Sequence, residues 1–178
     1  VMAVRPIFCV KLSIAGSCHN RYCESLFLGY AGETKFYDNY RAYRGGVYHN
    51  LTIVNNPRDS IDWRAQGLVT DIKNQKQCGS CWAFSATGAV ESAYAIDSGN
   101  LLNLSEQQIV DCDVTNHGCN GGDMDNAFVY VEENGLCTLD SYEYVGSQDP
   151  SCRKCNAKVY ITGYKDVETC NDRALDEA

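Results

Sequence analysis

The chain has 178 residues, enough for one ordinary domain with an apolar core or for two small ones. Its 44% hydrophobic and 11% aromatic content is typical of a folded globular protein. A formal net charge of −8 argues against nucleic acid as a partner, because no cluster of Lys and Arg is available to neutralise a phosphate backbone. No apolar run is long enough to span a bilayer, so a membrane protein is not expected either.

Residues 1–56 are predicted to form an N-terminal segment distinct from the rest of the chain. The segment opens with features of a signal peptide, namely Arg5, an apolar middle and then small residues at 15–17, although Lys11 interrupts the apolar run. The Tyr- and Gly-rich stretch that follows shows neither a helical nor an alternating period. The turn signal ending at Pro57 marks a boundary, so a second unit is predicted over residues 57–178.

Helix signals begin after residue 80. The first helix is predicted to start at Cys81 with Ser80 as its N-cap and to stop at Gly99. Its buried face is expected to carry Ala89, Ala93 and Ile96.

Two shorter helices are predicted further along the chain. A capping-box pattern over residues 105–108, Ser-Glu-Gln-Gln, predicts a helix that continues through Val110. Apolar residues at helical spacing from Met124 to Val131 predict another, ended by Gly135. The segment DCDVTNHGCNGGD between them is predicted to be a loop whose adjacent glycines let backbone approach a ligand closely.

Cysteine is the residue type most informative about chemistry. The chain has 11, a density that indicates an oxidising compartment. Because the number is odd, at least one thiol is left over after pairing within the chain, and it is either reactive or paired outside the chain. The motif QKQCGSCWAFSA places Cys81 at the start of a predicted helix, which makes it the leading candidate.

Two alternatives for Cys81 are a zinc site and a redox site. The pairs Cys78-x-x-Cys81 and Cys152-x-x-Cys155 could supply four thiolates to zinc. About seventy residues separate the pairs, however, against ~15–20 in a compact zinc ribbon. A thioredoxin-like redox site would need a preceding strand, and the upstream VTDIKNQKQ is too polar to predict one. No metal or other cofactor is therefore expected.

The remaining alternatives are a structural half-cystine and a catalytic nucleophile. A helix N-terminus stabilises the thiolate, which is the nucleophilic form, so the position favours catalysis. An amide donor such as Gln75 could stabilise the oxyanion of an attacked carbonyl together with the Cys81 N–H. Gly79 would let a substrate backbone pass the thiol, and Trp82 could either shield the site or pack in the core.

The segment from Gln75 to Ser85 resembles the signature of the papain and cathepsin cysteine proteases. The resemblance covers roughly residues 57–178 and rests on further motifs: Asp-Trp-Arg at 62–64, LSEQ at 104–107 with VDC at 110–112, GCNGG at 118–122, and SYEY at 141–144 with a later Cys152. It implies an α+β, papain-like fold, of which this chain is expected to hold mainly the helical left domain, with the β-rich right domain mostly missing.

The resemblance implies roles for individual residues. Cys81 would be the nucleophile and Gln75 the oxyanion donor. Gly121 and Gly122 would bind the substrate backbone as an added strand, and Gly79 would also be a substrate-binding residue. Met124 and Asp123 would line the pocket for the substrate side chain. It also implies the disulfides Cys78–Cys119 and Cys112–Cys152, while a third, Cys137–Cys155, is our hypothesis because both cysteines are left over.

Three departures from the family pattern stand out. The histidine and asparagine that assist the thiol are expected ~130–150 residues after it, beyond Ala178, so the 178-residue chain alone is expected to be inactive. Of the histidines, His19 and His49 precede the motif and His117 is interpreted as a solvated loop residue. Lys76 stands where the family commonly has Gly. Residues 1–56 occupy the place of a pro-segment without its long helices.

The sequence thus predicts a cysteine-type endopeptidase made as a zymogen in the secretory pathway, for a lysosome, a vacuole or the extracellular space. The expected partners are protein or peptide substrates and cystatin-like inhibitors, with a monomeric state when complete. The alternative is a non-catalytic homologue that binds peptides or sequesters inhibitors.

Overall fold

The computed structural model describes residues 63–166. The predicted N-terminal segment, residues 1–56, and both ends of the predicted 57–178 unit lie outside the described residues. Described residues up to Tyr164 belong to one compact unit.

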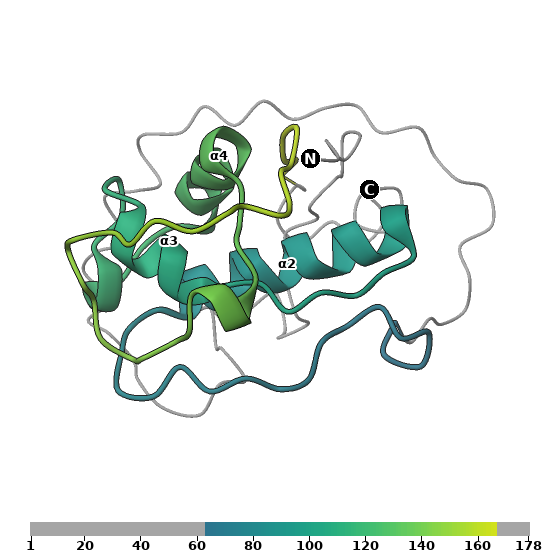
Figure 1. Ribbon diagram of the computed structural model, residues 1–178, viewed down its shortest axis with the longest axis horizontal. Coiled ribbons are helices and arrows are strands. Elements are labelled where there is room, and N and C mark those ends of the chain that lie inside the picture. The colour runs from purple at the N-terminus through teal and green to yellow at the C-terminus, as the bar shows by residue number, and fades with distance from the viewer. Residues whose placement is uncertain (1–62, 167–178) are drawn as a thin grey trace, which may run out of the picture. The chain divides into compact units, whose positions relative to one another are not determined.

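The regular structure of residues 63–166 is helical (Figure 1). Its elements are α2 (Cys81–Ser98), α3 (Glu106–Cys112), α4 (Met124–Asn134) and the 3-10 turns η1 (Gly118–Asn120) and η2 (Leu139–Ser141). Helix α2 packs against both α3 and α4. Strand pairing within these residues includes two isolated antiparallel bridges, Leu104–Thr138 and Leu136–Val159. The described part therefore corresponds to the helical portion of the predicted α+β fold.

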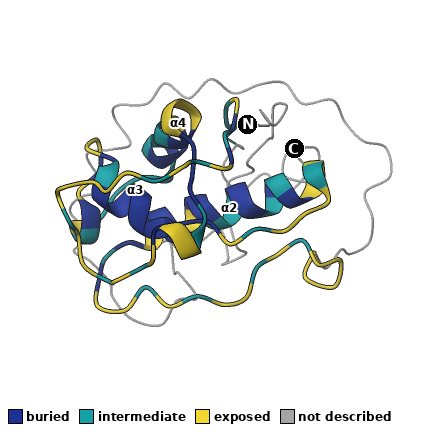
Figure 2. Ribbon diagram, viewed as in Figure 1, coloured by how far each residue is buried: buried dark blue, intermediate teal, exposed yellow. Residues whose placement is uncertain are grey.

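Helix α2 has the predicted bounds but not all of the predicted contacts. Gly99 ends it in a left-handed conformation, and its N–H donates to the Ala95 carbonyl. Ser80 occupies the N-cap position, but its side chain does not cap the helix and instead bonds Tyr144. The prediction that Ile96 is buried is wrong: Ile96 is 59% exposed, and Ala95 is the buried residue of the final turn. Figure 2 shows exposed and intermediate positions at this end of α2.

The predicted capping box of α3 forms only in part. Ser105 Oγ accepts the Gln108 N–H at 3.0 Å, as predicted. The Gln108 side chain does not reach back to Ser105, because its carbonyl accepts the Cys137 N–H and its amide donates to Gly135 O. The glutamine therefore ties α3 to the segment that follows α4. Helix α4 begins at Met124 and ends before Gly135, as predicted.

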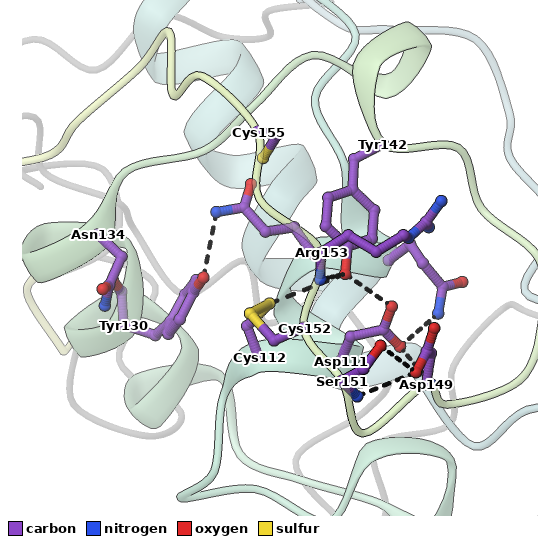
Figure 3. Close-up of a disulfide and its surroundings, with 12 residues drawn as sticks. Asp111, Cys112, Tyr130, Asn134, Tyr142, Asp149, Ser151, Cys152, Arg153 and Cys155 are labelled. Atoms are coloured by element: carbon purple, nitrogen blue, oxygen red, sulfur yellow. Dashed lines mark hydrogen bonds between the residues drawn. A yellow bond between two sulfur atoms is a disulfide. The ribbon is translucent and has the colours of Figure 1, made fainter.

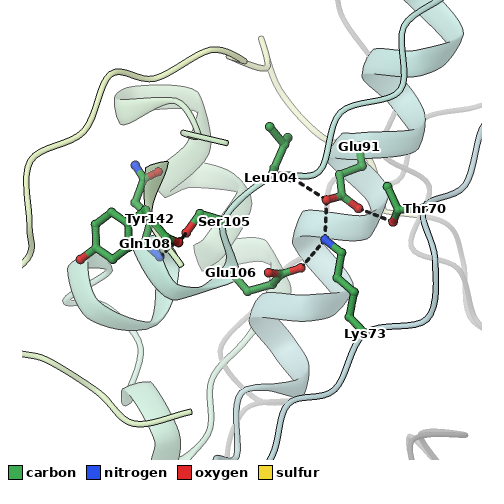
Figure 4. Close-up of polar contacts among 8 residues, drawn as sticks. All are labelled: Thr70, Lys73, Glu91, Leu104, Ser105, Glu106, Gln108 and Tyr142. Carbon is green, nitrogen blue, oxygen red and sulfur yellow. Dashed lines mark hydrogen bonds and ion pairs between the residues drawn. The ribbon is translucent and has the colours of Figure 1, made fainter. Parts of the chain in front are cut away.

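A buried carboxylate on α2 organises the polar interior (Figure 4). Glu91, 1% exposed, accepts hydrogen bonds from Thr70 Oγ1, Lys73 Nζ and the backbone N–H of Leu104. The same Lys73 ammonium lies 2.6 Å from Glu106 Oε1, at the start of α3. Lys73 thus links α2 to α3 through the two carboxylates. Because Lys73 and Thr70 belong to the extended segment before α2, these bonds also hold that segment alongside the helices (Figure 1).

Replacing Glu91 by Ala is expected to lower the free energy of unfolding by about 3 kcal/mol, because it leaves the buried Leu104 N–H unpaired and removes one carboxylate from Lys73. Denaturant unfolding measures the change. Glu132→Ala, on the exposed face of α4, is the control and should shift stability by no more than about 0.5 kcal/mol. Equal effects of the two substitutions would contradict the role of Glu91.

Glu106 should make stability depend on pH. Burial raises the pKa of Glu106 above its ordinary 4.5, although the Lys73 ammonium opposes the shift. Because the folded pKa is the higher one, the contribution of Glu106 to stability is fully present below pH 4.5 and is lost as pH rises through the folded pKa. The free energy of unfolding should be measured for the parent protein and for Glu106→Gln from about pH 4 to 7. As pH rises, the variant should become more stable relative to the parent. A difference that stays constant with pH would rule this out.

Candidate active site

Cys81 is the first residue of α2, and its side chain is exposed. Among the described cysteines it is the one that forms no disulfide. The first turn of α2 carries no acidic residue, so its N–H groups and the helix macrodipole act on the thiol unopposed by a carboxylate of that turn. This position favours the thiolate, the form that attacks carbonyl carbon.

The Cys78–Cys119 disulfide connects the loop before Cys81 to the turn η1. Beside it the Gly79 N–H donates to the Cys119 carbonyl at 2.8 Å. A Cβ at Gly79 would lie 2.5 Å from that oxygen, so this contact within the chain already requires glycine. The predicted passage of a substrate beside Gly79 stays a prediction.

The glycine loop, which contains Gly121 and Gly122 and follows η1, is held by Trp82, the second residue of α2. Its indole Nε1–H donates to Gly118 O at 3.1 Å, and its ring lies so near Gly122 that a Cβ there would come within 2.6 Å. Gly121 has a φ of 114°, a backbone conformation that favours glycine. Of the two roles considered for Trp82, the buried packing role is the one observed.

Asn116 fixes the far side of the same loop, a role that sequence analysis missed. Its Oδ1 accepts the Asp123 N–H at 2.7 Å, while its Nδ2 donates to Asp123 O and to Asp113 Oδ2. An asparagine that pairs with backbone in this way leaves no periodic or motif signal in a single sequence. Its only hint was its place within the predicted loop.

Asp123 and Met124 follow the glycines directly. The Asp123 carboxylate accepts the Asp125 N–H and so caps α4, and Met124 is half-buried against the core. Both residues therefore have structural roles that explain their identity. Their predicted part in a side-chain pocket is not decided by these contacts.

Gln75 lies in the turn that leads to Cys81. Its side-chain Nε2 donates to Cys78 O at 2.8 Å, which uses one of the two N–H groups of the amide. The backbone carbonyl of Gln75 accepts a hydrogen bond from the Tyr144 hydroxyl at 2.7 Å. Lys76 adopts a φ of 55°, which explains why glycine suits this position. Lys76 N–H donates to Asn74 Oδ1, so a local turn supports the conformation.

The described residues contain three disulfides, and they are the pairs that sequence analysis expects: Cys78–Cys119, Cys112–Cys152 and Cys137–Cys155. Figure 3 shows Cys112–Cys152 beside Tyr142, whose hydroxyl donates to Asp111 Oδ2 and accepts the Arg153 N–H. The Arg153 guanidinium stacks on the same ring at 4.1 Å. These contacts fasten the 149–153 segment to α3.

The disulfides also decide against the zinc alternative. Three of the four thiols that it requires, those of Cys78, Cys152 and Cys155, are bonded to other cysteines, and no group of metal-ligating side chains gathers within residues 63–166. His117 is exposed at the start of η1, where its N–H bonds Gly121 O. Within the same residues, no helix is long and apolar enough to cross a bilayer.

Comparison with known families matches residues 57–178 to the papain family cysteine proteases. The chain belongs to this family. The thiol protease SEN102 of Hemerocallis is 48% identical over 136 residues, which make up 74% of this chain and 37% of SEN102. A cathepsin L-like proteinase of Phaedon cochleariae is 48% identical over 67% of this chain and 38% of its own length.

Solved structures agree with the fold. The Carica candamarcensis cysteine protease CMS1MS2, crystallised in complex with E-64, is 42% identical, with a TM-score of 0.62 over 65% of this chain and 55% of that one. The proform of the ragweed pollen protease Amb a 11 is 50% identical, with a TM-score of 0.55 over 57% of this chain and 31% of that one. The present chain thus spans less than two thirds of each relative, and its described residues match the papain-like fold.

Alkylation of the native, non-reduced protein should label Cys81 and none of the other described cysteines. The reason is that Cys81 is exposed and outside a disulfide, whereas the other six described cysteines are bonded in pairs. Peptide mapping after iodoacetamide treatment measures this. Cys81→Ser should remove the label, and label on Cys137 or Cys155 would contradict the third disulfide.

Proposed function

We propose that the whole protein containing this chain is a papain-like cysteine endopeptidase that uses Cys81 as its nucleophile. The observation that carries the proposal is the position of this thiol, exposed at the start of α2 and joined through Cys78–Cys119 to the glycine loop. Membership of the protease family supports the same assignment.

In this reaction the Cys81 thiolate attacks the carbonyl carbon of the scissile peptide bond, and a C–S bond forms. The oxyanion accepts hydrogen bonds from the Cys81 N–H and from the second N–H of Gln75 Nε2. The C–N bond then breaks, and the amine takes a proton from the histidine that the family supplies. Water hydrolyses the resulting thioester, which releases the acid and returns the thiol.

The glycine loop is suited to holding an extended peptide. Within residues 63–166, no hydrogen bond involves the N–H or the carbonyl of Gly122, and in this proposal a substrate backbone pairs with both. The bonds to Trp82 and Asn116 keep this loop in place without using those groups. Met124 and Asp123 follow it and would border the pocket for the adjacent substrate side chain.

The proposed function also implies the partners and the compartment of the protein. Peptide substrates and cystatin-like inhibitors would bind beside Cys81 and the glycine loop, and the enzyme would be monomeric. Three disulfides within residues 63–166 favour an oxidising compartment, and we assign the protein to the secretory pathway with the lysosome, the vacuole or the cell exterior as its destination.

Gln75→Ala in the whole protein is expected to lower kcat for a peptide substrate by about 10²–10³-fold, because an oxyanion donor is lost. The rate at which iodoacetamide alkylates Cys81 should stay within about twofold of the parent rate, because alkylation forms no oxyanion. Gln77→Ala, an exposed glutamine of the same loop, is the matched control and should retain kcat. Loss of kcat in both variants would count against the donor role. An absence of Cys81-dependent turnover in the whole protein, with peptide binding retained, would replace the enzyme by the non-catalytic alternative.

A further inference from the structure

We propose that Tyr144 is a positioning residue for the reaction. Its hydroxyl holds the backbone of Gln75 in a fixed position relative to the start of α2. The inference rests on the proposed function, because it concerns the oxyanion donor of that site. Tyr144 follows η2 and lies 69 residues along the chain from Gln75, so its contact with the catalytic loop is tertiary.

The hydroxyl of Tyr144 joins two points of the loop. It donates to the Gln75 carbonyl at 2.7 Å and lies 2.7 Å from Ser80 Oγ. A phenol has one hydrogen, so when Tyr144 donates to Gln75, Ser80 must donate to Tyr144. Burial raises the pKa of Tyr144, so the hydroxyl keeps the proton that this arrangement needs. A single oxygen thus fixes the backbone of Gln75 relative to the residue that precedes Cys81.

The tyrosine ring is itself fixed from two sides. Phe84, on the first turns of α2, meets it edge-on with 4.8 Å between ring centroids. Lys76 places its ammonium 6.0 Å from the ring centroid and 3.5 Å from Val145 O. The Lys76 stem lies against Gly146, where a Cβ would come within 2.8 Å of it. The ring is therefore held between α2 and the side chain next to Gln75.

Ser80 and Lys76 both direct their side chains toward this tyrosine. The Ser80 hydroxyl lies 2.7 Å from the Tyr144 hydroxyl and makes no cap hydrogen bond with α2. Lys76 has a left-handed backbone conformation, which costs on the order of 1–2 kcal/mol, and its ammonium lies on the Tyr144 ring. Two residues of the loop before Cys81 thus contact Tyr144, beside the proposed oxyanion donor.

Tyr144→Phe in the whole protein removes the hydroxyl and keeps the ring. Because the backbone of Gln75 loses its anchor, we expect kcat for a peptide substrate to fall by roughly tenfold, since small misplacements of catalytic groups cost up to about 10²-fold. KM should stay within about twofold. Tyr142→Phe is the matched control: it deletes another tyrosine hydroxyl, bonded to Asp111 and Arg153 rather than to this loop, and should leave kcat unchanged.

A double-mutant cycle separates positioning from general destabilisation. If Tyr144 acts through Gln75, Tyr144→Phe should change kcat by less than about twofold when Gln75 is already Ala. Amide hydrogen exchange of residues 75–80 should speed up in Tyr144→Phe and not in Tyr142→Phe.

Three results would overturn the inference: an unchanged kcat in Tyr144→Phe, an equal loss in Tyr142→Phe, or a loss that is undiminished in the Gln75→Ala background. Each of them requires a parent protein with Cys81-dependent turnover. A parent that lacks such turnover would instead overturn the proposed function, and the positioning role with it, so the two failures are distinguishable.

Discussion

The Cys78–Cys119 disulfide is the constraint on which the site depends, because it joins the loop before α2 to the turn before the glycines. With these segments linked, the Gly79 N–H reaches the Cys119 carbonyl and leaves no space for a Cβ at residue 79. Trp82 then packs against Gly122 from the first turn of α2. The thiol and the glycine loop are thereby placed by one covalent bond and two close contacts that only glycine permits.

Polar side chains, more than apolar ones, connect the short elements around this centre. Three buried side chains each bond backbone groups of a segment distant in sequence. Glu91 bonds Leu104, and Gln107 bonds Val145 and Ser147. Gln108 bonds Gly135 and Cys137. Irregular segments have backbone N–H and C=O groups that no helix or sheet satisfies, so buried polar side chains must do so. This explains how a region with little strand pairing among its described residues keeps long connections in fixed positions.

The helices could be predicted from sequence because their signals are local. Gly99 and Gly135 end helices by their own backbone freedom, and Ser105 caps α3 through a residue three positions on. Ser80 and Gln108 were assigned cap roles by the same rules, yet their side chains bond Tyr144 and Cys137. Nothing in the local sequence reveals a tertiary competitor for a hydroxyl or an amide. The family resemblance named the residues of the site, but the contacts among them are tertiary and leave no signal in the local sequence.

Lys76 stands where the family resemblance implies glycine, and the 144–146 segment accommodates it. A left-handed backbone favours glycine, and a lysine there adds strain but also adds a long stem and a charge. The stem finds room because residue 146 is glycine, and the ammonium finds the Tyr144 ring and the Val145 carbonyl. Gly146 in turn has a φ of 82°, so its lack of a side chain serves both its own turn and the lysine that lies over it. The substitution at residue 76 is therefore coupled to the 144–146 segment, and a change at either place would alter the loop that carries Gln75.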